Sequence, residues 1–579
     1  MENFILVKDV RVPLADGTKL STDIWRPDTE EPVPVLLMRT PYGKEDLVAY
    51  TMISPNVFAL LEAGYAVAVQ DVRGTFRSEG TFVPHVNEAE DGADVVRWLA
   101  AQEWCSGAVG GWGASYLGMV QWQAASTGVP ELKAIAPSLS TGDIHRAAWR
   151  TPGGALSHDL AERWTTLMAV NEVTRALAKG EGEEADLHAL VAEMADPADA
   201  VSRTPLIDRP VQAKYLPGAL DQVAGHPDRD EYWEALSALD RAGSITAPSL
   251  NIGGWYDSLI GGTIHGYTTM RKNGGSPEAR DGQRLIVGPW SHINLNGYFP
   301  DRHFGPGANV SAANLTGAYI AFYDRWLKGR EDALDGVSPV RIFVMGIDQW
   351  RDELDWPLPD TEYTPYYLAG DGPANTIGGQ GILTTTPPVG DTSDRYLYDP
   401  ARPVPTFGGT IIEFSGYDGA ADQRPVHDRD DVLCFQSEVL KEPVEVTGPV
   451  SAVFHVSSSA VDTDFTAKLV DVHPDGRAII LCDGILRMRY RHSLAEPELI
   501  EPGEVYEVTV DLLATSNVFL PGHRILLEVS SSNFPRYDRN SNTGGEIAKE
   551  HLSDMVPATN VIYRGAEYPS RVILPVINR

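Results

Sequence analysis

The chain has 579 residues, of which 43% are hydrophobic and 22% charged, proportions typical of a globular protein too long for a single hydrophobic core. Its formal net charge of −33 argues against nucleic acids and anionic membranes as partners, because both are bound by basic surfaces. The sequence shows neither a signal peptide nor an apolar run of about 18 residues that could span a membrane, so we expect a cytosolic protein.

The first part of the chain alternates between strand and helix patterns. A hairpin is expected within residues 5–27, with its turn at Asp16-Gly17. Some of the following segments are continuously apolar, as in strands that are buried on both faces. Others have apolar residues at helical spacing. These patterns predict strands at 33–38, 66–72 and 132–136 and helices at 57–63 and 88–101. Such alternation predicts a parallel α/β core.

The most informative motif is the stretch GGWGASYLG at residues 110–118. It follows a short apolar lead-in and precedes a helical run at 119–125, which is the strand–serine–helix layout of a nucleophile elbow around Ser115. The usual pattern has a glycine two residues after the serine, whereas here Leu117 holds that place and Gly118 follows it. The alternative is a glycine-rich surface turn with an idle serine.

The next stretches divide the chain further. Helical spacing without strand-like runs predicts a helical cap at 143–240, inserted between a first core segment at 1–142 and a second at 241–332. Residues 331–339 read as a linker, and short alternating segments with Gly and Pro turns predict a β-sandwich over 340–579. Its strands are expected to include 340–344, 363–368, 450–456, 467–470, 506–512 and 525–529.

Two polar residues end strands in the second core segment. Asp257 follows an apolar run that begins near Ala247, and His292 follows the run at 284–291. Either residue alone could be a turn or capping residue. After Ser115, however, they complete the chain order serine, acid, histidine at the strand ends where α/β sheets place their chemistry. We therefore predict a catalytic triad of Ser115, Asp257 and His292.

The sequence resembles the cocaine-esterase-like hydrolases, α/β-hydrolases related to X-Pro dipeptidyl peptidases and α-amino-acid ester hydrolases. The resemblance runs along essentially the whole chain. It rests on Arg39–Tyr42, Gln70–Gly74, Gly113–Gly118, Gly254–Asp257, Gly288–His292, Ser457–Phe465 and Ser530–Pro535. The family's serine motif carries its glycine three places after the serine, as here. The resemblance implies an α/β-hydrolase core with a helical cap and a C-terminal jelly roll, and is compatible with a homodimer.

The predicted triad suits acyl transfer from a small-molecule ester. Ser115 becomes a nucleophile when His292 takes its proton, and Asp257 fixes the imidazole tautomer. The backbone N–H of Tyr116 directly follows the nucleophile and is expected to donate to the oxyanion. The resemblance implies that the Tyr42 hydroxyl is the second donor; the alternative is an aromatic plug under its loop.

No metal or organic cofactor is expected. Acyl transfer by a serine triad needs none. The three cysteines are far apart and lack metal-binding spacing, so neither a disulfide framework nor a structural zinc site is expected.

Substrate preference is read from the resemblance. Trp149 and Trp164 match tryptophans that wall the acyl pocket in the family, and such walls favour an aromatic acyl group; the alternative is packing within the cap. Other pocket positions depart from the family pattern. They are Leu259 in place of a phenylalanine, Ile53 in place of a polar amide, and Glu413-Phe414, where a carboxylate interrupts an apolar-aromatic pair unless a one-residue slip returns Phe414 to the wall.

Other eye-catching residues receive structural interpretations. His85 and His145 lie in regions that could approach the site, but we expect both to be surface or capping histidines. The segment 533–540 could be a binding loop or a domain contact, and we favour the contact.

Three functions stay open from the sequence. The first is a serine carboxylesterase for small, aromatic-acyl esters. The second is an X-Pro dipeptidyl peptidase, an α-amino-acid ester hydrolase or a β-lactam acylase, which would need carboxylates to hold a free α-ammonium group; Glu413 is a candidate. The third is a non-catalytic scaffold, against which the complete Ser–Asp–His set argues.

Overall fold

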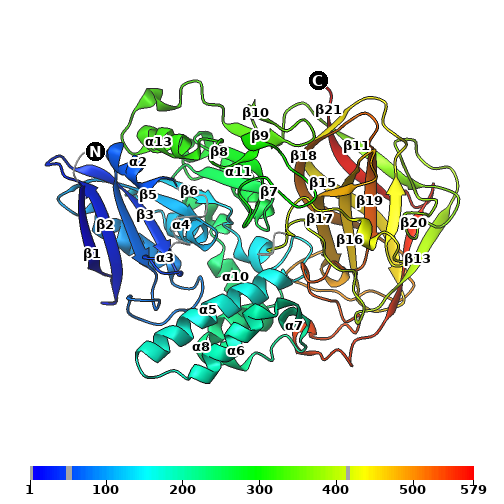
Figure 1. The fold of residues 1–579 in the computed structure, drawn as a ribbon, viewed down its shortest axis with the longest axis horizontal. Helices are drawn as coiled ribbons and strands as arrows, with labels where there is room; N and C mark the ends of the chain where they lie inside the picture. The colour runs from blue at the N-terminus through cyan, green and yellow to red at the C-terminus, as the bar shows by residue number, and fades with distance from the viewer. Residues whose placement is uncertain (1–3, 47–54, 413–416) are drawn as a thin grey trace.

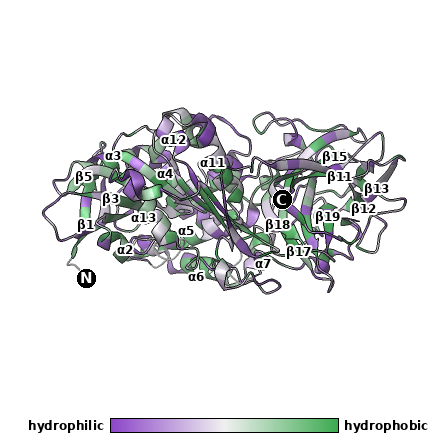
Figure 2. Cartoon of the chain, turned by 90° about the horizontal axis from the view of Figure 1, so that it is seen from above, coloured by the Kyte–Doolittle hydropathy of each residue, from purple (hydrophilic) through white to green (hydrophobic). Residues whose placement is uncertain are grey.

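The computed structural model describes residues 4–46, 55–412 and 417–579. Figure 1 shows an elongated molecule with one sheet near the N-terminus, a second near the C-terminus and a group of helices beside both. Hydrophobic residues concentrate along the strands of the two sheets (Figure 2). Among the described residues, no helix combines the length and apolarity that crossing a membrane requires.

The first sheet has ten strands within the described residues, in the order β1-β2-β4-β3-β5-β6-β7-β8-β9-β10. Strands β3 to β9 pair in parallel, whereas β1 and β2 form the expected antiparallel hairpin at one edge. The strands are β1 Phe4–Pro13, β2 Lys19–Pro27, β3 Val33–Thr40, β4 Ala66–Asp71, β5 Cys105–Ala114, β6 Leu132–Ser138, β7 Leu250–Tyr256, β8 Arg284–Ser291, β9 Val340–Val344 and β10 Gln349–Glu353.

Helices cover both faces of this sheet because its strands are apolar on both sides. In β3, Leu36 lies in the apolar cluster that contains Phe322 of α13, whereas its neighbour Leu37 lies in a second cluster that contains Val95 of α3. This alternation explains the continuous apolar runs. The covering helices are α2 Val57–Glu62, α3 Glu88–Ala100, α4 Tyr116–Ser126, α11 Ile260–Asn273, α12 Pro277–Asp281 and α13 Leu315–Trp326, with a short η4 at Pro306–Ala308 and η5 at Glu331–Leu334.

The segment between β6 and β7 is helical. Its longest helix, α5, packs on α6 and α8, and Ala169, Val173 and Leu190 form a small apolar core there (Figure 1). The elements are η1 His145–Trp149, α5 His158–Ala178, α6 Glu184–Ala195, α7 Pro197–Ser202, α8 Pro210–Tyr215, α9 Pro217–Leu220, η2 Asp221–Gly225, α10 Glu231–Leu236 and η3 Leu239–Ser244.

The second sheet contains eleven strands of the described chain. The strands are β11 Thr361–Ala369, β12 Ile382–Thr384, β13 Thr392–Tyr398, β14 Leu433–Gln436, β15 Val444–Ser458, β16 Asp464–Val472, β17 Ala478–Arg487, β18 Tyr506–Phe519, β19 Arg524–Ser530, β20 Ala558–Arg564 and β21 Arg571–Ile577. Short helices η6 Arg424–Val426, η7 Met488–Tyr490 and η8 Ile547–Lys549 interrupt them. An α/β core with a helical insertion, followed by an all-β part, confirms the fold class expected from the sequence.

One expected strand lies in the other sheet. The run at 340–344, read as the first strand of the β-sandwich, is β9, which pairs in parallel with β8 from Leu285 and Val340 onward. It therefore extends the α/β sheet, and β10 closes that edge as an antiparallel partner. Local pattern predicts a strand, but it does not tell which sheet the strand joins.

The segment 533–540 joins the β part to the start of α5. The backbone N–H groups of His158 and Asp159 donate to the carbonyls of Arg536 and Pro535, at 3.2 and 3.0 Å. The buried side chains of Arg536 and Asp159 form an ion pair at 3.5 Å. The interpretation of this segment as a domain contact is confirmed.

Candidate active site

Ser115 sits on a sharp turn between β5 and α4. Its backbone angles, φ 61° and ψ −127°, lie in a region that side chains rarely adopt. The turn is held by a bond from the Ser115 N–H to the Ser138 carbonyl and by another from Ser140 Oγ to the Ser115 carbonyl, both 2.9 Å. Flanking glycines are required: a Cβ on Gly113 would lie 2.6 Å from Leu117 Cβ, and one on Gly118 would overlap Ser140.

The ends of β7 and β8 bring the other two predicted triad residues to this turn. His292 Nδ1 lies 2.7 Å from Asp257 Oδ1, and His292 Nε2 lies 3.1 Å from Ser115 Oγ. Asp257 is fully buried and His292 is buried. Both imidazole nitrogens have a hydrogen-bond partner when Nδ1–H donates to the carboxylate and Nε2 accepts from the serine hydroxyl. That tautomer prepares His292 to take the serine proton.

Two donors flank Ser115. Tyr42, just after β3, accepts a hydrogen bond from Trp164 Nε1 at 3.0 Å, and its hydroxyl lies close enough to Ser115 for that side chain to influence the Tyr42 pKa. Burial raises the pKa of Tyr42 to about 12, so its hydroxyl stays protonated and able to donate. Tyr116 is the first residue of α4, and the N–H groups of a first helical turn have no acceptor within the helix. Both groups are thus suited to meet an oxyanion formed at Ser115.

A buried polar network fixes the first turn of α4. The Tyr116 hydroxyl donates to Glu88 Oε1 at 2.9 Å and accepts from the His85 backbone N–H at 3.0 Å. Glu88 forms a buried ion pair with Arg39 of β3 at 2.7 Å. Breaking one member would leave a buried charge without its partner, which is costly, so the network holds the Tyr116 N–H at a defined angle.

The chain matches known proteins along its whole length. Residues 16–294 match the X-Pro dipeptidyl-peptidase (S15 family) model, and residues 333–573 match the X-Pro dipeptidyl-peptidase C-terminal non-catalytic domain. Cocaine esterase of Rhodococcus sp. (strain MB1 Bresler) is 53% identical over 577 residues, which covers 100% of this chain and 99% of that protein. The chain belongs to the cocaine esterase-like S15 hydrolases.

Two solved structures of hydrolases share the fold of this chain over its whole length. An aminopeptidase from the marine sediment archaeon Thaumarchaeota archaeon is 26% identical with a TM-score of 0.80, covering 100% of this chain and 97% of that one. An α-amino acid ester hydrolase is 25% identical with a TM-score of 0.78, covering 99% and 97%. The hydrolase is thus a serine hydrolase with an α/β-hydrolase core, and its close relative places it among ester-cleaving enzymes.

An aromatic cluster lies beside the two donors in this hydrolase. Trp149 of η1 and Trp164 of α5 meet edge to face, with ring centroids 5.5 Å apart. Leu259, just before α11, is buried in the same apolar cluster. The structure thus brings together three of the predicted acyl-pocket residues, and the bond from Trp164 to Tyr42 connects them to the serine.

The expectation that His85 and His145 lie at the surface is wrong. Each is only 2% exposed. The His85 ring stacks on Tyr116 at 4.7 Å and on Trp164 at 6.2 Å, and burial lowers its pKa to about 3. His85 is therefore a neutral ring in the same buried aromatic cluster as Trp149 and Trp164. No local pattern marks it, because its partners come from α4 and α5.

Ile53, Glu413 and Phe414 lie outside the described residues. Their place at the acyl pocket stays a prediction.

Proposed function

We propose that the hydrolase is a carboxylesterase that cleaves small esters through an acyl-enzyme on Ser115 and prefers aromatic acyl groups such as benzoyl. The observation that carries this proposal is the hydrogen-bonded series Ser115–His292–Asp257, at 3.1 and 2.7 Å, beside the Tyr42 hydroxyl.

In the acylation step, Ser115 Oγ attacks the ester carbonyl carbon while His292 Nε2 takes the hydroxyl proton. The carbonyl oxygen becomes an oxyanion, which accepts from the Tyr116 N–H and the Tyr42 hydroxyl. His292 then gives the proton to the departing alkoxide oxygen as the ester C–O bond breaks. Asp257 keeps the imidazole in the required tautomer and stabilises its charged form.

Deacylation repeats these roles with water in place of the alcohol. His292 takes a proton from water as the water oxygen adds to the acyl carbon, and the same two donors receive the oxyanion. Collapse of this intermediate breaks the bond to Ser115 Oγ, which regains its proton from His292. The products are a carboxylic acid and an alcohol, and the enzyme is restored.

The aromatic preference rests on the cluster beside the serine. Trp149 and Trp164 meet edge to face, and Leu259 packs in the same cluster. Flat apolar walls gain contact area and favourable ring geometry from a planar acyl group. A benzoyl group would use both, whereas a butyryl group would use only the apolar area.

The test is hydrolysis of p-nitrophenyl benzoate, p-nitrophenyl butyrate, cocaine and Gly-Pro-p-nitroanilide by the wild type and Ser115→Ala. We expect ester turnover that Ser115→Ala abolishes, with the benzoate cleaved faster than the butyrate. Ser202→Ala is a matched control, because Ser202 is exposed at the end of α7. Turnover that survives Ser115→Ala would refute the assignment, and a butyrate preference would refute the aromatic pocket.

Peptidase activity is the alternative that the same panel tests. The family model and one solved relative carry peptidase names. A dipeptidyl peptidase needs a carboxylate available to an α-ammonium group. The candidate Glu413 lies outside the described residues, and the buried Glu88 beside Tyr116 is engaged by Arg39. Hydrolysis of the anilide but of none of the esters would favour the peptidase hypothesis and overturn the proposal.

A further inference from the structure

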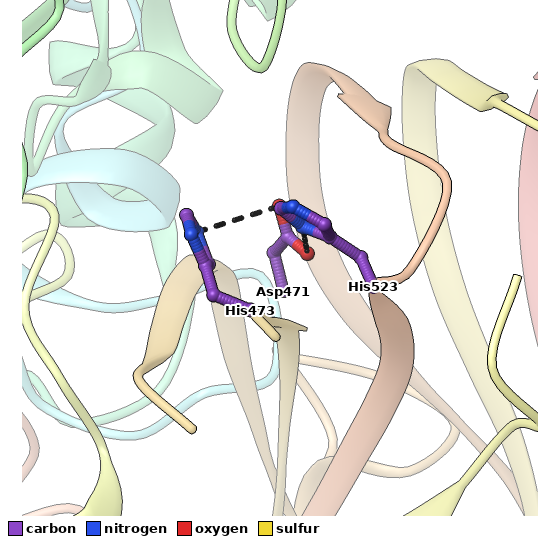
Figure 3. A group of neighbouring side chains, drawn as sticks. All are labelled: Asp471, His473 and His523. Carbon is purple, nitrogen blue, oxygen red and sulfur yellow. Dashed lines mark hydrogen bonds and ion pairs between the residues drawn. The ribbon is translucent and has the colours of Figure 1, made fainter. Parts of the chain in front are cut away.

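A cluster of three metal-ligating side chains lies far from Ser115 in sequence, at one end of the second sheet. Asp471 is near the end of β16, His473 follows that strand, and His523 immediately precedes β19. Figure 3 shows the three side chains pointing toward one another. One ligand atom from each residue lies within 4.8 Å of the others.

The contacts within the cluster bring the three side chains close together. His523 Nδ1 lies 2.7 Å from Asp471 Oδ1, and His473 Nε2 lies 3.8 Å from Asp471 Oδ2. The two imidazole rings are 4.5 Å apart between centroids. Zinc bonds of about 2.0–2.2 Å bring neighbouring ligand atoms to roughly 3–3.5 Å, so only small side-chain movements would separate this cluster from a ligand set.

The three residues also line a cavity of about 260 Å³. Asp471 and His523 are buried, whereas His473 is partly exposed. Asn517 lines the same cavity, and its buried side-chain nitrogen has no hydrogen-bond partner among the described residues. A fourth coordination position would therefore open onto space where a metal-bound water or anion meets a polar group.

We propose that Asp471, His473 and His523 form a site for a divalent transition-metal ion, with Zn²⁺ as the best-suited ion. Two imidazoles and one carboxylate are borderline ligands that zinc accepts in tetrahedral geometry, with water in the fourth place. On binding, the ion replaces the Nδ1 proton that His523 shares with Asp471, so zinc uptake releases a proton.

Two arginines near the site oppose a bound cation, but a carboxylate beside each offsets this repulsion in part. Arg302 and Arg477 line the cavity, but each is paired with a carboxylate of its own. Arg302 contacts Asp348 at 2.6 Å, and Arg477 contacts Asp475 at 2.8 Å. The Asp471 carboxylate contacts the two histidines, and it would offset half of the charge of a divalent ion.

The site lies where the second sheet meets the hydrolase core. The cavity is also lined by Tyr256 of β7, whose hydroxyl donates to the Ile480 carbonyl of β17 at 3.1 Å. A bound ion would hold the turns after β16 and before β19 together beneath this contact. Its role would be structural, because any ion that binds only the folded state stabilises that state. His473 and His523 are too far apart in sequence to form a recognisable metal-binding motif. The spacing of the cysteines argues against structural zinc held by cysteines alone and does not apply to these histidines.

The experiment uses the full-length protein after chelation and removal of the chelator. Zn²⁺ is titrated by calorimetry, Co²⁺ is followed by its visible absorption, and thermal unfolding is recorded with and without Zn²⁺. We expect one ion per chain, a tetrahedral cobalt spectrum and a higher Tm with zinc. His473→Ala and His523→Ala should each weaken binding by about 10-fold or more, whereas exposed His492→Ala should not.

Three results would overturn the proposal. They are no stoichiometric uptake of either ion, equal affinity in the wild type and His473→Ala, or a zinc-dependent Tm shift that His473→Ala retains. If His523→Ala does not fold, the partly exposed His473 still provides a variant, and anomalous scattering from zinc-soaked wild-type crystals locates the ion. An anomalous peak away from Asp471 would equally refute the site.

Discussion

The Tyr42 hydroxyl offers the sharpest test of the proposed oxyanion site. Tyr42→Phe removes one O–H donor beside Ser115 and keeps the ring in place. Loss of one such donor typically raises the barrier by about 3 kcal/mol, so we expect kcat for p-nitrophenyl butyrate to fall by about 10²–10³-fold. Burial raises the pKa of Tyr42 to about 12, so the hydroxyl is neutral across the working pH range and the fold-loss should be the same at pH 6 and pH 9.

The same substitution has a separate effect on stability. Trp164 Nε1 donates to the Tyr42 hydroxyl at 3.0 Å and would lose its acceptor. A buried donor left without a partner costs about 1–3 kcal/mol, so a lower Tm is also expected. The two effects separate the oxyanion role from that of an aromatic plug, because a plug alone predicts a loss of stability without a large fall in kcat.

The assay compares steady-state kcat and KM with thermal unfolding for the wild type and Tyr42→Phe. Tyr363→Phe is the control, because Tyr363 is 52% exposed on β11. A fall in kcat of less than 10-fold in a folded Tyr42→Phe protein would show that this hydroxyl does not stabilise the transition state. A larger fall in Tyr363→Phe than in Tyr42→Phe would refute the reasoning as well.

Three further predictions follow from the same site. Asp257→Asn should lower kcat by about 10⁴-fold with little change in Tm, because the amide no longer holds the active imidazole tautomer; a fall of under 10-fold would contradict the triad. Gly118→Ala should destabilise the protein by about 1–3 kcal/mol in denaturant unfolding, because its Cβ would overlap Ser140; unchanged stability would contradict the close approach. His85→Asn should make the free energy of unfolding less dependent on pH between pH 6.5 and pH 3. Burial lowers the His85 pKa from 6.5 to about 3, so below pH 6.5 the unfolded chain binds a proton that the folded chain does not, and stability falls by up to about 1.4 kcal/mol per pH unit until pH 3. Equal pH slopes for wild type and His85→Asn would refute this assignment; asparagine suits the left-handed backbone there.

Much of the fold could be predicted because its local patterns are unambiguous. In β3, adjacent Leu36 and Leu37 face different helix layers, so a continuous apolar run is required and is what the sequence shows. The placement of β9 could not be predicted in this way. Its five residues suit a strand in either sheet, and pairing with β8 depends on contacts between distant segments.

The candidate site also contains residues that the sequence predicts and residues that it does not. Ser115, Asp257 and His292 are marked by strand ends and chain order, and the structure places them within hydrogen-bonding distance. The burial of His85 in the aromatic cluster could not be predicted, because its ring is placed by Tyr116 from α4 and by Trp164 from α5. Such contacts join elements far apart in sequence and leave no local spacing to detect.

Trp164 contacts both the proposed oxyanion donor and the proposed acyl pocket. Its indole nitrogen donates to the Tyr42 hydroxyl, and its ring meets Trp149 and stacks on His85. The proposed acyl pocket and the proposed oxyanion donor therefore share one side chain, which comes from the helical insertion. A change in the insertion that moves this ring would alter acyl selectivity and the position of the Tyr42 hydroxyl together. Selectivity at the proposed pocket is thus expected to change along with kcat. A change at Leu259, which packs in the same apolar cluster but as an aliphatic side chain cannot form a hydrogen bond with Tyr42, should alter selectivity with less effect on rate.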